Sequence, residues 1–269
     1  MGATVEIVAV GNELLDGLTQ DTNTHWLCRQ ISGLGSWVRR AVLVRDDVEA
    51  IATEVLAARG RATALLLVTG GLGPTADDVT LEGLARAADR PLVEHPIARE
   101  MVARRYAELH RRGLLASPEL SRQRLKMAVL PEGAEPIENP VGAAPAVLLR
   151  LEPTTIVCLP GVPTELKGIF TEQLPPVLTS ILGAGVLAER DVLVRLNDES
   201  AMAGAIAEVA ALFPDIYVKS HARRFEQEGG IRVTLSARGT QRAAVEALLD
   251  QAEEAVRARL PVEDAAHGR

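Results

Sequence analysis

A short apolar run that ends in a glycine-rich turn limits what this 269-residue chain can fold into. Residues 69–80 read Thr-Gly-Gly-Leu-Gly-Pro-Thr-Ala-Asp-Asp-Val-Thr and directly follow the apolar run 64–68. This pattern predicts a buried strand, a tight turn and the start of a helix. Glycine permits positive φ and lets a ligand approach the backbone, because it carries no Cβ. Free N–H groups at the start of such a helix favour a phosphate or another oxyanion.

Two carboxylates in the same turn narrow the kind of ligand expected there. Asp77 and Asp78 would repel a phosphate unless a cation lay between them, so the turn indicates a phosphorylated ligand with a divalent metal ion. A purely structural alternative stays open, in which the glycines only make a tight turn and the two aspartates cap the helix. The presence of Thr75 and Thr80 in the same short stretch favours the ligand-binding interpretation.

Strands and helices alternate over the first part of the chain. We predict strands at 5–10, 38–44 and 64–68, and helices at 22–34, 48–58 and 79–88. Such repeats need crossover connections and therefore predict a parallel sheet with helices on both faces.

The middle of the chain adds further elements to this sheet. Two strands, at 147–151 and 155–159, are joined by a turn, and a helix over 164–181 follows with Thr164 as its N-cap. The segment 95–127 is helical in pattern and rich in arginine. We interpret its arginines as a solvated helix face; they are Arg99, Arg104, Arg105, Arg111 and Arg112.

The pattern changes after the two prolines at 175 and 176. Strands at 192–196, 216–220 and 231–237 and helices at 199–212 and 241–260 follow in the order βαββα. This order predicts a smaller α+β unit. We place an α/β main domain at 1–182, the α+β domain at 183–261 and a tail at 262–269.

Polar clusters follow the strands of the predicted parallel sheet, at the edge where ligands bind in such folds. The clusters are 11–17 with 21–23, 45–47, 69–80, and 160–163 with Glu165 behind it. Asp46 and Asp78 are the candidates for both catalysis and metal binding, because carboxylate pairs suit Mg²⁺ and similar ions. The candidates for phosphate or nucleotide binding are Glu13, Asn23, Gly70, Gly71, Leu72, Gly73, Thr75, Asp77, Asn139, Gly142, Pro160, Gly161 and Lys219.

Several of these residues also have a structural interpretation. Either Asp46 or Asp47 fits as the N-cap of the next helix, and Asn23 fits a turn or a cap. The loop 139–145 either closes over the site or only connects two strands.

A basic group near the carboxyl end of the chain has the same ambiguity. Lys219, with Arg223 and Arg224 after it, either contacts phosphate or belongs to an exposed hairpin. His221 has no second histidine near it in sequence, so the pattern does not support a zinc site.

Composition excludes several classes of protein. The chain is 47% hydrophobic and 24% charged, which is typical of a folded globular protein and argues against disorder. Its aromatic content of 3% and net charge of −7 disfavour nucleic acid as the main ligand, since such binders use stacking platforms and a basic surface. No stretch has the length of a membrane span and no signal peptide is visible, so we expect a cytoplasmic protein. Cys28 and Cys158 are expected to be buried free thiols.

Four of these motifs together resemble the competence/damage-inducible protein A (CinA) family, in its amino-terminal molybdopterin-binding-like domain. The motifs are 11–15 with 21–23, 69–80, 139–142 and 159–163, and the likeness runs from about Val5 to Phe170. The resemblance implies a three-layer α/β/α domain that is frequently dimeric. It also implies metal-dependent pyrophosphatase activity on ADP-ribose and similar dinucleotides. The strand at 217–220 with its hairpin is similar to the family's smaller KH-type subdomain.

The resemblance also assigns roles to particular residues. Asp46 and Asp78 match acidic positions that are considered functional across the wider superfamily, and Gly70, Gly71, Gly73 and Thr75 match its ligand-cradling loop. The family's Gly-Thr-Ala-Pro-Gly run is Gly-Ala-Ala-Pro-Ala at 142–146, which predicts a different closure over the substrate. The family's amidohydrolase domain has no counterpart in these residues, so we expect the stand-alone, archaeal-type form without deamidase activity.

Three functions are compatible with the sequence. The first is a hydrolase that uses Mg²⁺, Co²⁺ or Mn²⁺ to split the pyrophosphate of ADP-ribose or a related dinucleotide. The second is a molybdopterin-binding or molybdenum-cofactor biosynthesis protein, and the third is a non-catalytic nucleotide-binding sensor or scaffold. In each, the ligand is a small nucleotide or pterin, and we expect a homodimer.

Overall fold

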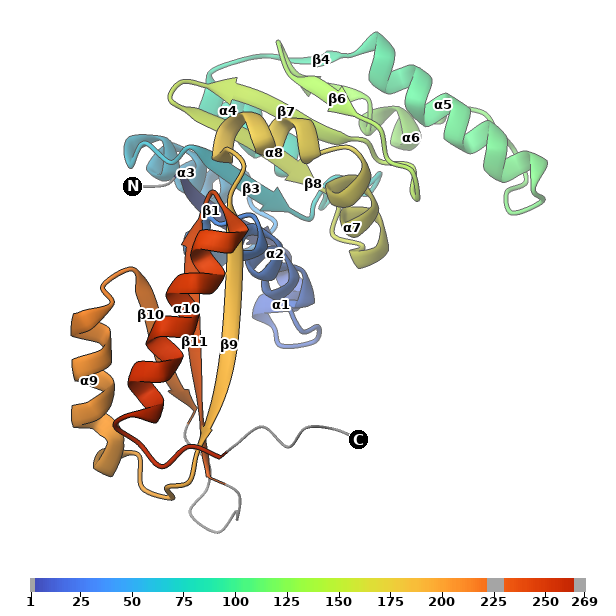
Figure 1. Cartoon of the computed structure of the whole chain (residues 1–269). Helices are drawn as coiled ribbons and strands as arrows, with labels where there is room; N and C mark the ends of the chain where they lie inside the picture. The colour runs from blue at the N-terminus through green and yellow to red at the C-terminus, as the bar shows by residue number, and fades with distance from the viewer. Residues whose placement is uncertain (1–2, 222–229, 264–269) are drawn as a thin grey trace. The chain divides into compact units, whose positions relative to one another are not determined.

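A computed structural model describes residues 3–221 and 230–263 of the chain (Figure 1). Arg223, Arg224 and the tail beyond residue 263 lie outside the described residues. The chain divides into two compact units, each with its own apolar core. Unit 1 comprises Met1–Ile31 and Trp37–Gly183, and unit 2 comprises Ser32–Ser36 and Ala184–Arg269.

Unit 1 is built around a six-stranded sheet with the order β2-β1-β3-β8-β7-β6. Its strands are β1 (Thr4–Val10), β2 (Trp37–Val44), β3 (Leu65–Thr69), β6 (Glu135–Ile137), β7 (Ala146–Leu151) and β8 (Thr154–Leu159). The first four strands in that order are parallel, and β7 and β6 each pair antiparallel with the strand before them. The central strands β1, β3 and β8 are covered on both faces, which explains their nearly continuous apolar sequences. The predicted, mostly parallel sheet is confirmed.

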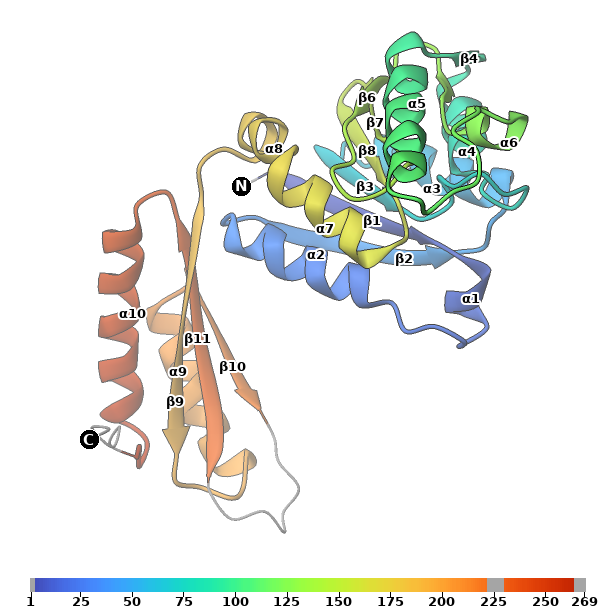
Figure 2. The ribbon, with the colours of Figure 1, turned by 90° about the vertical axis from the view of Figure 1, so that its right-hand side faces the viewer.

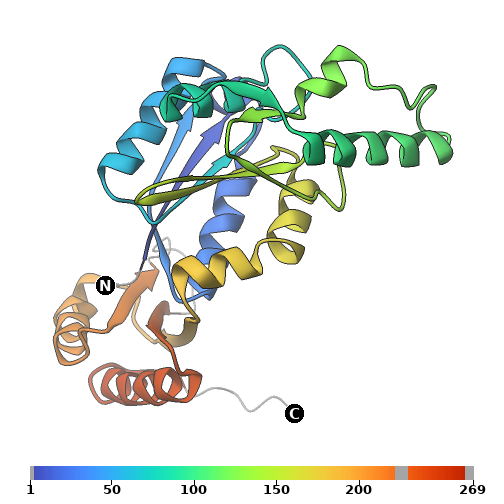
Figure 3. The same cartoon turned by 90° about the horizontal axis from the view of Figure 1, so that it is seen from above.

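Helices cover both faces of this sheet, which gives three layers (Figures 2 and 3). One face carries α3 (Val48–Gly60), α4 (Thr80–Ala88) and α5 (Pro96–Arg111), whose apolar side chains share a core with the strands. The other carries α2 (Thr22–Gly33), α7 (Pro163–Glu172) and α8 (Pro175–Leu182). Trp26 of α2 meets Phe170 of α7 edge to face, with ring centroids 5.2 Å apart. Smaller elements complete the unit: α1 (Asn12–Leu15), α6 (Arg122–Lys126), β4 (Leu92–Glu94) and β5 (Val129–Pro131).

The single helix predicted over 164–181 is wrong, because the chain forms two helices there. A proline has no N–H to donate and its ring clashes with the preceding turn, so α7 ends at Glu172 and α8 begins at Pro175. Thr164 is not the N-cap of α7 either. Pro163 occupies the first helical position and Val162 precedes it as the cap residue.

The interpretation of the α5 arginines as a solvated face is wrong for one residue. The side chain of Arg105 is only 18% exposed and forms an ion pair with Glu108 at 2.8 Å. It also donates a hydrogen bond to the carbonyl oxygen of Val141. Arg105 therefore ties α5 to the loop 139–145.

In its described residues, unit 2 contains a three-stranded antiparallel sheet, in the order β10-β11-β9, two α-helices and a short 3₁₀ helix. Its elements are β9 (Val186–Val194), the short 3₁₀ helix η1 (Ser200–Met202), α9 (Ala203–Leu212), β10 (Ile216–His221), β11 (Ile231–Gly239) and α10 (Arg242–Arg257). Alternate residues of β11, such as Val233 and Leu235, share a core with Leu249 of α10. The predicted smaller α+β unit is confirmed. Its first strand is longer than predicted, because the pairing of β9 with β11 continues to Val186 opposite Gly239.

The two cysteines are free thiols in unit 1. Cys158 lies in β8 without solvent contact, and burial raises the pKa of its thiol to about 12. Cys28 is only partly buried, and burial followed by the charge of Asp21 raises the pKa of its thiol as well. A raised pKa keeps both thiols protonated, so neither is an activated nucleophile.

The described parts of the chain contain no helix with both the length and the apolar character needed to cross a bilayer.

Candidate functional site

The carboxyl ends of the four parallel strands border one cavity of about 510 Å³, the main cavity. Gly11 follows β1, Asp46 follows β2, Gly70 follows β3 and Pro160 follows β8, and all four residues lie on its wall. The polar clusters that the sequence places after these strands therefore meet in one place. The other candidate residues on this wall are Glu13, Gly71, Leu72, Gly73, Asp77, Asp78 and Gly161.

The turn after β3 requires glycine at its first two positions. Gly70 has φ +93° and Gly71 has φ +64°, in the left-handed region where a side chain is strained. A Cβ at Gly70 would overlap the carbonyl oxygen of Val10 in β1, and a Cβ at Gly71 would overlap the hydroxyl of Thr80. That hydroxyl donates to the carbonyl oxygen of Gly70 at 2.8 Å, which holds the turn against the start of α4. The turn thus packs closely against β1 and α4, and its glycines line the main cavity.

Asp77 and Asp78 fold back on Thr75 instead of capping α4. Oδ2 of Asp78 accepts from the backbone N–H of Thr75 at 2.9 Å and lies 2.6 Å from its hydroxyl. The same hydroxyl lies against Oδ1 of Asp77. This hydrogen bond, then the N–H of Asp77 itself and the charge of Lys126, hold the pKa of Asp77 below its ordinary value. The N-cap of α4 is Val79, without a side-chain bond, so the capping alternative is wrong.

Asp47, and not Asp46, caps the helix that follows β2. Oδ1 of Asp47 accepts a hydrogen bond from the backbone N–H of Ala50 at 2.8 Å. Asp46 lines the main cavity instead. Its Oδ2 accepts from the backbone N–H of Asn12 at 2.8 Å, which fixes the carboxylate against the start of α1.

Asp46 and Asp78 are the two candidate metal ligands, and both lie on the wall of the main cavity. Each carboxylate uses Oδ2 for hydrogen bonds within the protein and lies on the wall of the main cavity. Within residues 3–221 and 230–263, no three His, Cys, Asp or Glu side chains gather into a metal-binding group. Mg²⁺ is commonly held by one or two carboxylates and takes its other ligands from water and substrate phosphates. The described carboxylates therefore form no preformed metal cage, and a cation at Asp46 or Asp78 would need water or substrate phosphate as further ligands.

Glu13 and Asn23 lie on different walls near Gly161. Glu13 of α1 lines both the main cavity and a smaller one of about 100 Å³. Asn23 lines only the smaller one, and its Nδ2 donates to the carbonyl oxygen of Gly161 at 2.7 Å. Asn23 is not the cap of α2, because Asp21 caps that helix by accepting a hydrogen bond from the N–H of Thr24 at 2.9 Å. Asn23 thus holds the turn after β8 from behind.

Asn139 organises the loop 139–145 from the inside. Its side chain is buried, and its Nδ2 donates to the carbonyl oxygen of Ala144 at 2.8 Å and to Oε2 of Glu165 at 2.7 Å. Its Oδ1 accepts from the N–H of Gly142 at 2.7 Å. Neither Asn139 nor Gly142 lines the main cavity, whereas Ala144 and Glu165 do. Asn139 therefore acts on the cavity through the residues that it positions.

The wall of the main cavity includes Tyr106 and Met127, which the sequence-based assignment does not name, and Glu165, which it places behind the cluster at 160–163 without a role of its own. Tyr106 belongs to α5 and Met127 follows α6, in a segment whose pattern indicates only a surface helix. Their place is decided by tertiary packing, which periodicity does not show. The place of Glu165 on the cavity wall could have been predicted, since it lies in the first turn of α7 directly after the cluster at 160–163.

Two further candidates lie elsewhere than on the main cavity. Thr75 lines a second cavity of unit 1, on the other side of the glycine turn. Lys219 lies on β10 of unit 2 with its side chain exposed, paired in register with Thr234 of β11.

Comparison with known proteins identifies the family. The family model of the probable molybdopterin binding domain matches residues 6–180, which is most of unit 1. A protein of Aeropyrum pernix is 45% identical over 245 residues, which cover 90% of this chain and 88% of that protein. A protein of Pyrococcus furiosus is 36% identical over 241 residues, which cover 90% of this chain and 94% of that protein.

A solved structure supports the same conclusion. The protein CinA of unknown function from Thermoplasma acidophilum is 34% identical and superposes with a TM-score of 0.59, over 65% of this chain and 98% of that chain. The chain therefore belongs to the family of the probable molybdopterin binding domain and is a CinA-like member of it.

Proposed function

We propose that this protein is a metal-dependent pyrophosphatase that hydrolyses ADP-ribose or a related dinucleotide. One observation carries the proposal: Asp46 and Asp78 share the main cavity with the backbone of the glycine turn at 70–73. Backbone N–H groups of a glycine turn suit phosphate oxygens, and carboxylates suit the cation that offsets the phosphate charge. A site with both is suited to a pyrophosphate group.

In the proposed reaction, water attacks one phosphorus atom and the bond from that phosphorus to the bridging oxygen breaks. ADP-ribose then yields AMP and ribose 5-phosphate, and the two protons of water pass to solvent. A bound divalent cation offsets phosphate charge and lowers the pKa of its water. Asp46, fixed by the N–H of Asn12, and Asp78, fixed by Thr75, would hold that cation. Because both carboxylates are already positioned, they need little reorganisation during the reaction.

The test is release of AMP from ADP-ribose, with Mg²⁺, Co²⁺ and Mn²⁺ supplied in turn. We expect Asp46→Ala and Asp78→Ala each to lower the rate at least about 100-fold, because each removes a charged ligand of the cation. Asp47→Asn is the matched control, since it removes the neighbouring carboxylate but keeps the cap of α3, and its rate should stay within about twofold. Well-folded protein that turns over no member of a dinucleotide panel with any of these ions would show the hydrolase proposal to be wrong.

A second candidate function is binding of molybdopterin or a role in molybdenum-cofactor biosynthesis. The match of residues 6–180 to the probable molybdopterin binding domain favours it. Fold alone does not separate the two functions, because one cradle can hold either kind of phosphate. Calorimetry with molybdopterin and with ADP-ribose on the same sample discriminates them. Binding of ADP-ribose without product, unchanged by Asp78→Asn, would instead favour the non-catalytic sensor or scaffold.

A further inference from the structure

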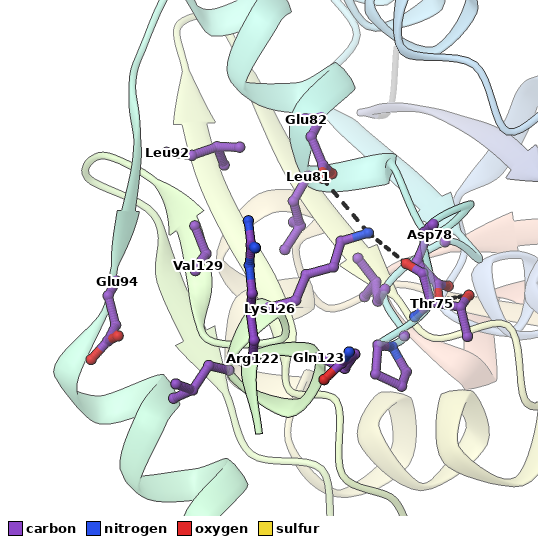
Figure 4. Close-up of a pocket in the computed structure, with 16 residues that line it drawn as sticks. Thr75, Asp78, Leu81, Glu82, Leu92, Glu94, Arg122, Gln123, Lys126 and Val129 are labelled. Atoms are coloured by element: carbon purple, nitrogen blue, oxygen red, sulfur yellow. Dashed lines mark hydrogen bonds and ion pairs between the residues drawn. The ribbon is translucent and has the colours of Figure 1, made fainter. Parts of the chain in front are cut away.

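Unit 1 contains a second cavity, of about 620 Å³, on the other side of the glycine turn (Figure 4). It lies between that turn, α4, α6 and the ribbon formed by β4 and β5. The two cavities have five lining residues in common: Gly71, Leu72, Gly73, Pro74 and Asp78. The turn therefore borders both cavities, and a ligand with its phosphates at the turn would lie next to the second cavity.

The lining of the second cavity includes a group of aliphatic side chains. Leu81 comes from α4, Leu92 from β4, Leu125 from α6 and Val129 from β5. Figure 4 shows Leu81, Leu92 and Val129 gathered on the side away from the turn. None of the described residues that line this cavity is aromatic, so aliphatic side chains would pack on the faces of a bound ring.

Most charged groups around this cavity already have partners. Lys126 donates to the carbonyl oxygen of Thr75 at 2.6 Å and lies 3.7 Å from Oε1 of Glu82, as the dashed lines of Figure 4 show. Glu94 accepts from Arg99 at 2.9 Å. We therefore interpret Lys126 as a residue that links the glycine turn to α6, and not as a ligand-binding residue.

Arg122 and Gln123, at the start of α6, are the polar groups that stay available. Neither side chain makes a hydrogen bond or ion pair with any residue of the described ranges, 3–221 and 230–263. A glutamine amide offers a donor and an acceptor side by side, which matches the N6 and N7 edge of adenine. A guanidinium binds phosphate or stacks on a ring face.

We propose that the second cavity binds the nucleoside half of the substrate. The purine base lies between Leu81, Leu92 and Val129, with Gln123 at its edge and Arg122 on its face or its phosphate. The cavity volume is within the range of about 300–1,000 Å³ that is usual for small-molecule sites. This proposal rests on the proposed function, because it takes the phosphates at the glycine turn to belong to a nucleotide.

Calorimetric titration with AMP tests the proposal on the full chain. We expect Gln123→Trp, which fills the mouth of the cavity, and Arg122→Glu, which reverses its free charge, each to weaken AMP binding at least about 10-fold. Both residues are exposed, so circular dichroism should show an unchanged fold. Arg111→Glu is the matched control, because Arg111 is an exposed arginine of α5 away from both cavities. Absence of AMP binding to the wild-type chain, or variants that bind AMP as tightly as the wild-type chain does, overturns the proposal.

A second arm separates this proposal from the pyrophosphatase itself. In an active protein, the two variants should raise KM for ADP-ribose about 10-fold and leave kcat within about twofold, since they remove binding remote from the reacting bond. AMP binding that is lost in both variants, in a protein without turnover, supports the cavity assignment while the hydrolase fails. A phosphorylated pterin that occupies this cavity where AMP does not would overturn the nucleoside assignment.

Discussion

Gly70 shows how a single backbone position decides the form of the site. Its left-handed conformation turns the chain at the end of β3, and its lack of Cβ lets it lie against the carbonyl oxygen of Val10. Its own N–H donates to the carbonyl oxygen of Leu159 at 2.9 Å. One residue thus joins the ends of β1, β3 and β8, which are three of the four parallel strands whose clusters meet at the main cavity.

Alanine at Gly70 should destabilise unit 1 by about 2–4 kcal/mol, because it combines left-handed strain with overlap against a strand carbonyl that has no room to move. Gly113→Ala is the control. Gly113 also has positive φ, at +72°, but a Cβ there would meet no atom within 4 Å. It should cost only about 1 kcal/mol, from the φ strain alone. Urea denaturation of both variants measures the difference, and equal losses would contradict a role for close approach at Gly70.

At the scale of helices and strands, the sequence predicts what local pattern determines. The apolar runs of β1, β3 and β8 are buried on both faces, so their type, direction and polar ends are readable in advance. The position of Tyr106 on the cavity wall could not be predicted, since helical periodicity does not show which neighbour a half-polar helix packs against. The extra length of β9 could not be predicted either, because residues 186–191 form a strand only through pairing with β11.

A buried ionic network joins three elements at the other end of the sheet. Glu6 of β1 is 2% exposed and accepts from Arg61, after α3, through two bonds of 2.9 and 2.6 Å. It also accepts from the hydroxyl of Thr63, before β3, at 2.7 Å. Burial acts to raise the pKa of Glu6, but these hydrogen bonds and the charges of Arg61 and Arg40 outweigh it, so the pKa lies below the ordinary value of 4.5.

Glu6→Gln should therefore destabilise the protein in a pH-dependent way. At pH 7 we expect a loss of about 1–3 kcal/mol, at the lower end for a buried pair because Arg61 is partly exposed. Because the folded pKa is depressed, the wild-type advantage is present above pH 4.5 and is lost as the pH falls through the folded value. Denaturation midpoints at several pH values measure this. If the difference in unfolding free energy between the wild-type chain and Glu6→Gln stayed constant into the acid range, the ion pair would not be its cause.

For the whole molecule, the division into two units with separate cores predicts independent unfolding. Both tryptophans of the chain, Trp26 and Trp37, belong to unit 1, and Trp26 packs against Phe170 there, so the change in Trp26 fluorescence reports on that unit. Leu249→Ala removes a fully buried side chain from the core of unit 2 and should cost about 2–5 kcal/mol there. We expect part of the circular dichroism transition to move to lower urea while the fluorescence midpoint stays unchanged.

A fluorescence midpoint that moved together with the circular dichroism signal would show instead that the units unfold as one. The homodimer expected from the family resemblance stays a prediction, which sedimentation velocity on the full chain tests.

The rate at which the thiol of Cys158 is alkylated measures how often the sheet of unit 1 opens at β8. The thiol lies in β8, between β3 and β7, and its raised pKa and complete burial keep reagents from it while those strands stay paired. The rate of alkylation at this position, followed by mass spectrometry, therefore reports how often β8 separates from its neighbouring strands. No label has to be introduced, and Cys28, in a different peptide, serves as the internal standard.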